Sequence, residues 1–245
     1  MDRDLAAALA DDLDAFIRLH DREADAELLA ALQAAGFPDS LALPPAGAAG
    51  AQAYAALRQA LAALGHPVGG AALDRLAADY AGIYLTHRCG ASPYESVWVD
   101  DDHLTCQQPM FELRQRYAAA GLRVADQRRR YDDHLVCQLQ YLRARLLAAD
   151  ADWADLTVFM DEHLGYWLGQ FAERVTQFGD TDFYAGVAQV TYVWVERCRE
   201  VLDEIHGLPR PPRDVVTARV RRKMALDKAE VAPIKFMPGA QGPSW

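Results

Sequence analysis

Residues 153–171 read WADLTVFMDEHLGYWLGQF and carry a strong helical pattern. Large apolar side chains recur in this stretch every three or four residues: Trp153, Leu156, Met160, Leu164, Trp167 and Phe171. Because an α-helix turns once every 3.6 residues, this spacing places all six side chains along one face. A half-buried β-strand would instead need apolar residues at every second position. The stretch therefore predicts a helix with one buried face.

The segments on either side of this stretch repeat the pattern. Upstream, the apolar positions are Leu135, Leu139, Leu142 and Leu146, and downstream they are Phe183, Val187, Val190, Trp194, Val201 and Ile205. Asp152 and Thr181 are suitable N-cap residues, and Gly179 and Gly207 are suitable helix ends. The C-terminal half thus predicts three consecutive helices.

The N-terminal half alternates shorter helical patterns with loops. Helices are expected over about 4–19, 23–35, 51–64, 71–85 and 109–121, with a Pro/Ala/Gly linker over 43–50 and loops over 86–107 and 122–130. The loop over 86–107 is unusually long for a compact domain, and such loops often carry function. Residues 96–99 are the only short candidate for a strand.

Together these patterns predict an all-α fold, a single helical-bundle domain over residues 1–209. Its N-terminal half, 1–121, is expected to be looser than the C-terminal helices over 131–207. The breaker Arg210-Pro211-Pro212 should separate this domain from residues 210–245. That last segment is expected to form a short basic helix over about 214–227 and an irregular, flexible C-terminal tail over 233–245.

Composition limits the class of protein. The chain has 245 residues, is 51% hydrophobic and carries a formal net charge of −10, which is enough for a substantial core. An acidic protein repels phosphates, so nucleic acid is not an expected partner. The N-terminus lacks the basic and apolar regions of a signal peptide, and no apolar run approaches about 20 residues. We therefore expect a cytoplasmic protein without stable membrane insertion.

The sequence offers little for catalysis or cofactor binding. It contains neither a P-loop nor a dinucleotide-binding glycine motif, so we expect no enzyme activity, no catalytic residues and no cofactor. The four cysteines form no C-x-x-C pair and are expected to be reduced thiols. The pairs His87/Cys89, His103/Cys106 and His134/Cys137 leave open an alternative, a small helical metal-binding or redox-sensing protein, although their irregular separations favour no metal site.

Two segments combine apolar and ionisable side chains outside the helix interiors. The first is Pro93-Tyr94-Glu95-Ser96-Val97-Trp98, followed by the acidic run Asp100-Asp101-Asp102, and the second is Asp132-Asp133-His134-Leu135. This combination suits a surface that binds a peptide with both apolar and cationic residues. The aspartates of the second segment also predict capping of the following helix, and an Asp–His couple there would order a loop.

These segments, with Tyr80, Tyr84, Pro109-Met110 and Tyr117, resemble the TorD/DmsD/NarJ chaperones over about residues 73–205. The loop motif of that family matches Pro93, Tyr94, Ser96, Val97 and Trp98. Its Glu-Pro-x-Asp-His hinge motif falls on residues 130–134, where Arg130 and Tyr131 replace the Glu-Pro and the Asp-His pair is kept. Because of this departure, the family's hinge geometry and domain swapping are not carried over to this chain.

The resemblance implies a helical bundle of the TorD/DmsD type that binds the twin-arginine leader of the apo-form of a molybdopterin oxidoreductase until its cofactor is inserted. We predict that the leader contacts Tyr94, Glu95, Ser96, Val97, Trp98, Asp100, Asp132, Asp133, His134 and Leu135. A structural adaptor that binds a partner helix is a further alternative. The identity of the client, the choice between monomer and dimer, and any binding of nucleotide stay open.

Overall fold

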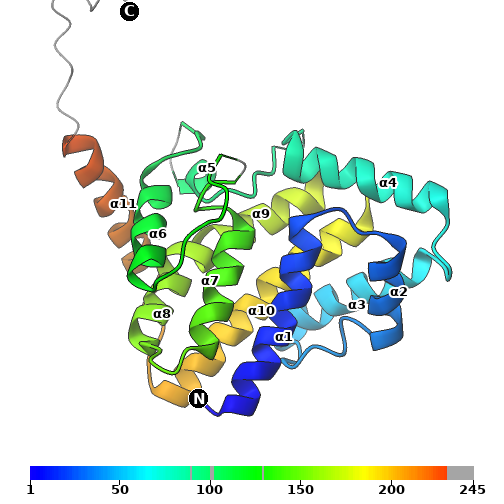
Figure 1. Ribbon diagram of the computed structural model, residues 1–245, viewed down its shortest axis with the longest axis horizontal. Coiled ribbons are helices and arrows are strands. Elements are labelled where there is room, and N and C mark those ends of the chain that lie inside the picture. The colour runs from blue at the N-terminus through cyan, green and yellow to red at the C-terminus, as the bar shows by residue number, and fades with distance from the viewer. Residues whose placement is uncertain (89, 100–101, 129, 231–245) are drawn as a thin grey trace, which may run out of the picture.

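The apolar stripes predicted from the sequence lie on the packed faces of helices, except that Ile205 at the end of the last stripe is exposed. Figure 1 shows how these helices are arranged. This computed structural model describes residues 1–88, 90–99, 102–128 and 130–230, with side chains as far as residue 225. In chain order the α-helices are α1 (Arg3–Asp21), α2 (Ala26–Ala35), α3 (Gly47–Ala63), α4 (Gly70–Tyr80), α5 (Ser96–Val99), α6 (Gln108–Ala119), α7 (Leu135–Leu147), α8 (Trp153–Phe159), α9 (Gly165–Phe178), α10 (Asp182–His206) and α11 (Arg213–Glu230). Two π-helical turns, η1 (Ala81–Leu85) and η2 (Met160–Leu164), follow α4 and α8.

The long helix α10 is the centre of the bundle. It packs against α3 and α9, while α1 lies along α7 (Figure 1). Gly186 allows the close approach of α3, because an added Cβ would lie 3.0 Å from the Cα of Leu57. Trp194 is fully buried, stacks edge-on against Phe16 of α1 and donates a 2.7 Å hydrogen bond to Asp12. The N-terminal helices thus share one hydrophobic core with the C-terminal ones.

The stretch over 153–171 is helical throughout, as predicted, but it is not a uniform α-helix. Its middle is the π-helical turn η2, and all five residues of η2 are buried. The wider π turn brings three ionisable residues, Asp161, Glu162 and His163, into the interior beside the apolar stripe. Single π turns of this kind occur frequently at functional sites.

The predicted helix boundaries in the C-terminal half are confirmed. Asp152 caps α8 by accepting from the Asp155 amide, and Thr181 caps α10 by accepting from the Tyr184 amide. Gly207 ends α10 in the left-handed region at a φ of 65°, which favours glycine. The same half therefore follows local sequence signals closely.

Two local predictions in the N-terminal half are wrong. Residues 96–99 form the single turn α5 and not a strand, because the Trp98 amide closes a helical turn by donating to Glu95 O at 2.8 Å. The linker is shorter than predicted, since α3 already begins at Gly47. The one isolated β-bridge in the described part of the chain joins Tyr94 to His134.

The basic segment after the Pro-rich breaker is helical, as predicted, and forms α11. It packs against η2 and α6 at one end of the bundle (Figure 1). The tail over 233–245 and the acidic residues Asp100 and Asp101 lie outside the described residues. Among the helices whose structure is described, none has the length and hydrophobicity to cross a bilayer.

Candidate functional site

The two segments singled out in the sequence lie side by side. Besides the bridge between Tyr94 and His134, the Glu95 amide donates to Asp133 O at 3.1 Å and the Leu135 amide donates to Pro93 O at 2.8 Å. The Tyr94 ring meets the His134 ring edge-on, with the ring centroids 4.9 Å apart. The loop before α5 is therefore fixed to the N-terminus of α7 by the backbone.

Most side chains of the two segments point inward. Six of the predicted contact residues are buried: Glu95, Ser96, Asp132, Asp133, His134 and Leu135. Tyr94, Val97 and Trp98 are half-buried, and Asp100 lies outside the described residues. Of these side chains, a peptide on the surface can therefore reach only Tyr94, Val97 and Trp98. The six buried residues hold the two segments in position.

The helix cap here differs from the prediction. The N-cap of α7 is His134, whose Nδ1 accepts a 3.0 Å hydrogen bond from the Val136 amide, so the expected capping by aspartates is wrong. Asp133 instead accepts from the Ser96 amide at 3.0 Å and does not pair with His134. Each residue thereby holds one of the two segments in place: Asp133 holds α5 and His134 holds α7.

Asp133 is an unusual carboxylate because it is fully buried and only one of its two oxygens accepts a hydrogen bond. Its Oδ1 has no hydrogen-bond partner. Burial raises the pKa of Asp133 to about 6, against the weaker lowering by hydrogen bonds from Ser96. Burial likewise lowers the pKa of His134 well below its ordinary range, so that its ring is neutral and able to accept from the Val136 amide.

Glu95 is the first member of a buried polar network that runs from α5 to α11. One of its carboxylate oxygens accepts from Gln138 Nε2 at 2.8 Å, and the other lies 2.9 Å from His163 Nδ1. The second nitrogen of His163, Nε2, lies 3.3 Å from Glu112 Oε1. Lys223 Nζ of α11 lies 2.5 Å from the same Glu112 oxygen. The network thus connects the loop motif to the C-terminal helix.

His163 is the cation at the centre of this network. Burial alone would lower its pKa, but the charges of Glu95 and Glu112 and its hydrogen bonds to them raise the pKa of His163 to about 9. The imidazole is therefore protonated at neutral pH and donates to both carboxylates. Burial would raise the pKa of Glu112, yet His163 and Lys223 together hold it below its usual range.

A second buried ion pair lies next to this network. Arg199 of α10 donates two 2.9 Å hydrogen bonds to the carboxylate of Asp161 in η2, and both side chains are buried. Arg210 reaches Asp161 at 3.0 Å and also pairs with Glu196. These contacts fix η2 against α10 and the start of the C-terminal segment.

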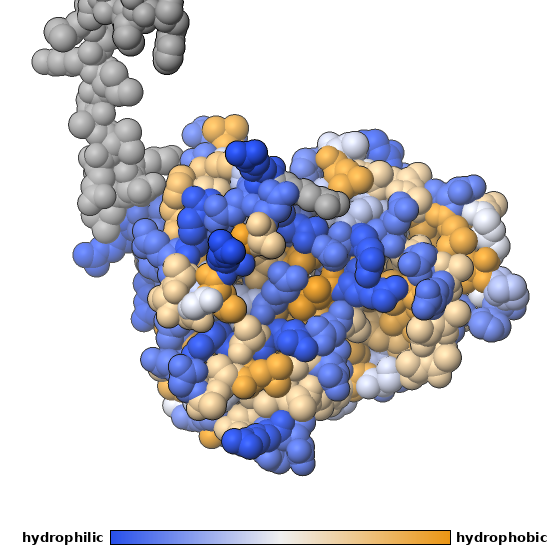
Figure 2. Space-filling model, in the orientation of Figure 1, coloured by the Kyte–Doolittle hydropathy of each residue, from blue (hydrophilic) through white to orange (hydrophobic). Residues whose placement is uncertain are grey.

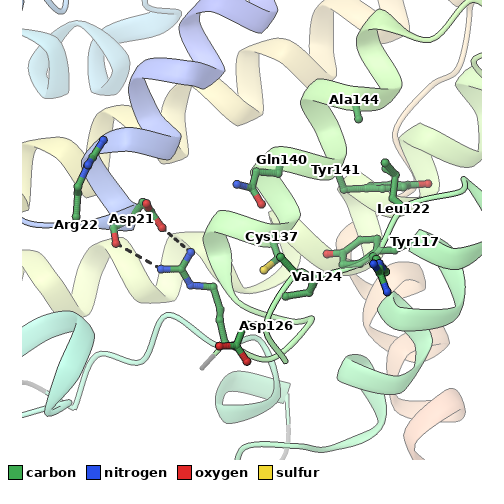
Figure 3. Close-up of a pocket in the computed structure, with 13 residues that line it drawn as sticks. Asp21, Arg22, Tyr117, Leu122, Val124, Asp126, Cys137, Gln140, Tyr141 and Ala144 are labelled. Atoms are coloured by element: carbon green, nitrogen blue, oxygen red, sulfur yellow. Dashed lines mark hydrogen bonds and ion pairs between the residues drawn. The ribbon is translucent and has the colours of Figure 1, made fainter. Parts of the chain in front are cut away.

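A surface groove runs along α7 from Cys137 onward, and none of the predicted leader contacts that the structure describes is among its lining residues. Its first hollow, of about 600 Å3, lies between the end of α1, α7 and the loop over 122–126 (Figure 3). Tyr117, Leu122, Val124 and Tyr141 give it apolar walls, and its charged rim is formed by Asp21, Arg22, Arg123, Asp126 and Arg130. Arg130, which replaces the Glu of the family hinge motif, forms an ion pair with Asp21 at 2.5 Å.

The groove continues into a second hollow of about 760 Å3 along α6 and α7. The two hollows share Leu122, Tyr141 and Ala144, and the second one reaches Glu112. Figure 2 shows small hydrophobic patches on this face within a largely hydrophilic surround. The geometry suits an extended or helical peptide that is partly apolar and partly charged.

The His–Cys pairs do not converge in the described part of the chain. His134 caps α7, Cys137 is buried with its sulfur 3.6 Å from Tyr131 O, and His103 bonds Val97 O. Cys89 lies outside the described residues. Over the ranges that the structure covers, no three His, Cys, Asp or Glu side chains are placed to hold a metal ion.

Comparison with known proteins decides the family. The model of the nitrate reductase delta subunit family matches residues 44–173, which is more than half of the chain and includes both motif segments. The chain belongs to this family. The match places it among the TorD-type maturation chaperones, in agreement with the resemblance found from the sequence.

Individual members of the TorD group are similar at moderate identity. The chain is 31% identical to the chaperone protein TorD of Vibrio cholerae serotype O1 over 140 residues, which are 53% of this chain and 63% of that protein. It is 32% identical to TorD of Shewanella pealeana over 140 residues, covering 54% of this chain and 62% of that protein. The chain thus spans less than two thirds of the length of these curated relatives.

Sequence reasoning missed His163, Glu112, Glu162 and Lys223. The available signal was the run Asp161-Glu162-His163, three ionisable residues within an otherwise apolar helical stretch. Such residues are seldom buried unless they are paired. Their partners come from Glu95 before α5 and from α6, α10 and α11, so the pairing itself depends on tertiary packing.

Proposed function

We propose that this protein is a cytoplasmic maturation chaperone for a molybdenum-cofactor oxidoreductase. It binds the twin-arginine leader of the apo-enzyme and holds that enzyme back from export until the cofactor is inserted. It has no catalytic role of its own. Membership of the TorD-type family supports the proposal, as does the acidic net charge of −10, which favours a cationic peptide.

The observation that carries the proposal is the groove along α7, which starts at Cys137, just after the joined motif segments, and is lined by neither of them. A twin-arginine leader presents two adjacent cations followed by an apolar, helix-forming stretch. The groove offers apolar walls from Tyr117, Leu122 and Tyr141 and reaches carboxylates at both ends, Asp21 and Glu112. Its floor is α7, whose N-terminus is capped by His134, while Asp133 holds the neighbouring α5.

The apolar walls must supply most of the affinity. A surface pair between arginine and carboxylate contributes only about 0–1 kcal/mol. Apolar surface contributes roughly 25 cal/mol for each Å2 that is buried. We therefore expect the carboxylates to select the twin-arginine sequence and the groove to hold the following apolar stretch.

A deletion strain tests the proposed function in the cell. The gene for this protein is removed, and the activity and molybdenum content of each molybdoenzyme with a twin-arginine leader are measured. At least one of these enzymes is expected to lose most of its activity and most of its molybdenum. Both should return when the gene is supplied on a plasmid. Unchanged activity and molybdenum content in every such enzyme would contradict the proposal.

The variants Asp133→Ala and His134→Ala are expected to weaken leader binding about fivefold. Each removes a hydrogen bond that holds α5 or α7; a loss of about 1 kcal/mol in leader-binding free energy corresponds to a factor of about five. Binding is measured by titration calorimetry, and helical content by circular dichroism should stay close to that of the parent protein.

Matched controls are Asp74→Ala and His66→Ala, two exposed residues outside the groove. They should bind leader peptide with the affinity of the parent protein. Unchanged affinity in both Asp133→Ala and His134→Ala would remove these residues from the binding region.

A further inference from the structure

We propose that the acidic surface under α11, formed by Glu112 of α6 and Glu162 of η2, is the binding site for the two arginines of the leader, and that α11 occupies this site until a leader replaces it. The inference rests on the proposed function and assigns it a location. It also gives α11 a role, because this helix of the same chain covers the binding site when no leader is bound. Neither Glu112 nor Glu162 was expected from the sequence.

The contacts of α11 show that this surface already accepts cations. Lys223 Nζ lies 2.5 Å from Glu112 Oε1 and 2.8 Å from Glu162 Oε2. Arg219 Nη1 lies 3.4 Å from Glu162 Oε1. Because one ammonium group reaches both carboxylates, Glu112 and Glu162 converge closely enough for a single guanidinium fork to bridge them.

The charges beneath α11 require two cations. The carboxylates of this region are Glu95, Asp161 and Glu162, which are buried, and Glu112, which is 21% exposed; the buried cations are His163 and Arg199, and the charges of Arg210 and Glu196 beside them offset each other. Two negative charges are left over, and Lys223 and Arg219 match them. The Glu162 side chain is only 6% exposed, so leaving it unpaired would be costly. A leader that brings two arginines can therefore take the place of Lys223 and Arg219 more readily than α11 can leave with no replacement.

The binding mode of α11 also matches that of a leader. Val216, Val220 and Met224 recur every four residues and form its buried face. Its cations flank that apolar stripe, while Arg221 and Arg222 are exposed on the outer side. A leader that folds into a helix would present the same combination of cations beside an apolar face.

The cations of α11 are partly open to solvent. The Lys223 and Arg219 side chains are 36% and 49% exposed, so an arginine of a leader can approach the carboxylates beside them. The helix is joined to α10 through the Pro-rich segment 208–212. These features favour detachment of α11 from α6 and η2 when a leader binds.

The position of Glu112 connects this site to the groove. Glu112 lines the second hollow, which joins the first hollow through Leu122 and Tyr141. Figure 1 shows α11 beside α6 at this end of the bundle. Arginines bound at Glu112 would direct the following apolar stretch along α6 and α7 toward Tyr117 and Val124.

The test compares two double variants of the full chain. Arg219→Glu with Lys223→Glu places negative charges opposite Glu112 and Glu162 and should detach α11. Arg221→Glu with Arg222→Glu changes the net charge by the same amount on the exposed side of the same helix. The probe is a synthetic twin-arginine leader peptide, together with a second peptide in which both arginines are replaced by glutamine.

We expect the first double variant to bind the twin-arginine peptide about tenfold more tightly than the control variant, because its binding-competent fraction is larger. The glutamine peptide should not show this gain. Hydrogen exchange of the amides over 213–225 should be faster in the first variant, and in the parent protein it should become faster when the leader is added.

Equal leader affinity in the two double variants would overturn the proposed location while leaving the proposed function standing. Leader binding to the parent protein without a change in exchange over 213–225 would overturn it in the same way. Absence of leader binding in the parent and in both variants would overturn both proposals.

Discussion

Replacing His163 by leucine is expected to lower the free energy of unfolding by about 3–5 kcal/mol at pH 7, the cost of removing one partner from a buried ion pair. The substitution removes the only cation in direct contact with Glu95, among the described residues, and leaves that buried carboxylate with Gln138 as its donor. Glu112 would keep Lys223. Urea unfolding followed by circular dichroism measures the loss.

The same substitution is expected to change how stability depends on pH. The pKa of His163 is raised to about 9 in the folded protein, from an ordinary value of 6.5. Its contribution to stability is therefore fully present below about pH 6.5 and is lost as the pH rises to 9. At about 1.4 kcal/mol for each pKa unit, the loss amounts to roughly 3 kcal/mol. The leucine variant should lack this alkaline decline.

The control is His66→Leu, which alters an exposed histidine and should change stability by less than about 0.5 kcal/mol. It should keep the decline between pH 6.5 and 9. A leucine variant at position 163 with the stability and pH dependence of the parent protein would show that His163 does not carry a buried charge.

The second large effect is expected for Asp161→Ala. This change leaves the guanidinium of Arg199 buried without its bidentate partner, and within the described part of the chain its remaining hydrogen bond is to Leu208 O at 3.0 Å. The free energy of unfolding should fall by about 3–5 kcal/mol. Chemical denaturation at pH 7 provides the measurement.

Two further variants separate the ion pair from other effects. The double variant Asp161→Leu with Arg199→Met removes both charges and should be more stable than Asp161→Ala, because no charge is left buried without a partner. Asp150→Ala removes an exposed carboxylate 3.7 Å from Arg145 and should cost less than about 1 kcal/mol. If the double variant were as unstable as Asp161→Ala, the lower free energy of unfolding would come from lost packing and not from the unpaired charge of Arg199.

The fold could be predicted largely from local pattern. The stripes ending at Phe171 and Ile205 and the caps at Asp152 and Thr181 depend on residues within a few positions of one another. Local periodicity was sufficient because the helices bury one face each. It was insufficient over residues 96–99, where a turn is closed by backbone hydrogen bonds and the side chains give no helical period.

The site was less predictable, for a physical reason. The sequence identified the two segments that meet at Tyr94 and His134, and the backbone contacts between them agree with a shared location. It did not indicate which side chains point inward, because burial of Glu95 and Asp133 depends on partners 43 and 37 residues away, Gln138 and Ser96. Lys223 lies 111 residues from Glu112, and no local pattern relates the two.

The measurement that tests the central claim most directly is titration calorimetry of the full-length protein with twin-arginine leader peptides. The peptides are those of the molybdoenzymes encoded in the same genome, each paired with a version in which both arginines are replaced by glutamine. We expect at least one leader to bind with a Kd below about 100 µM, or about −5.5 kcal/mol, and its glutamine version to bind more weakly. Failure of every leader to bind in this range would contradict the account.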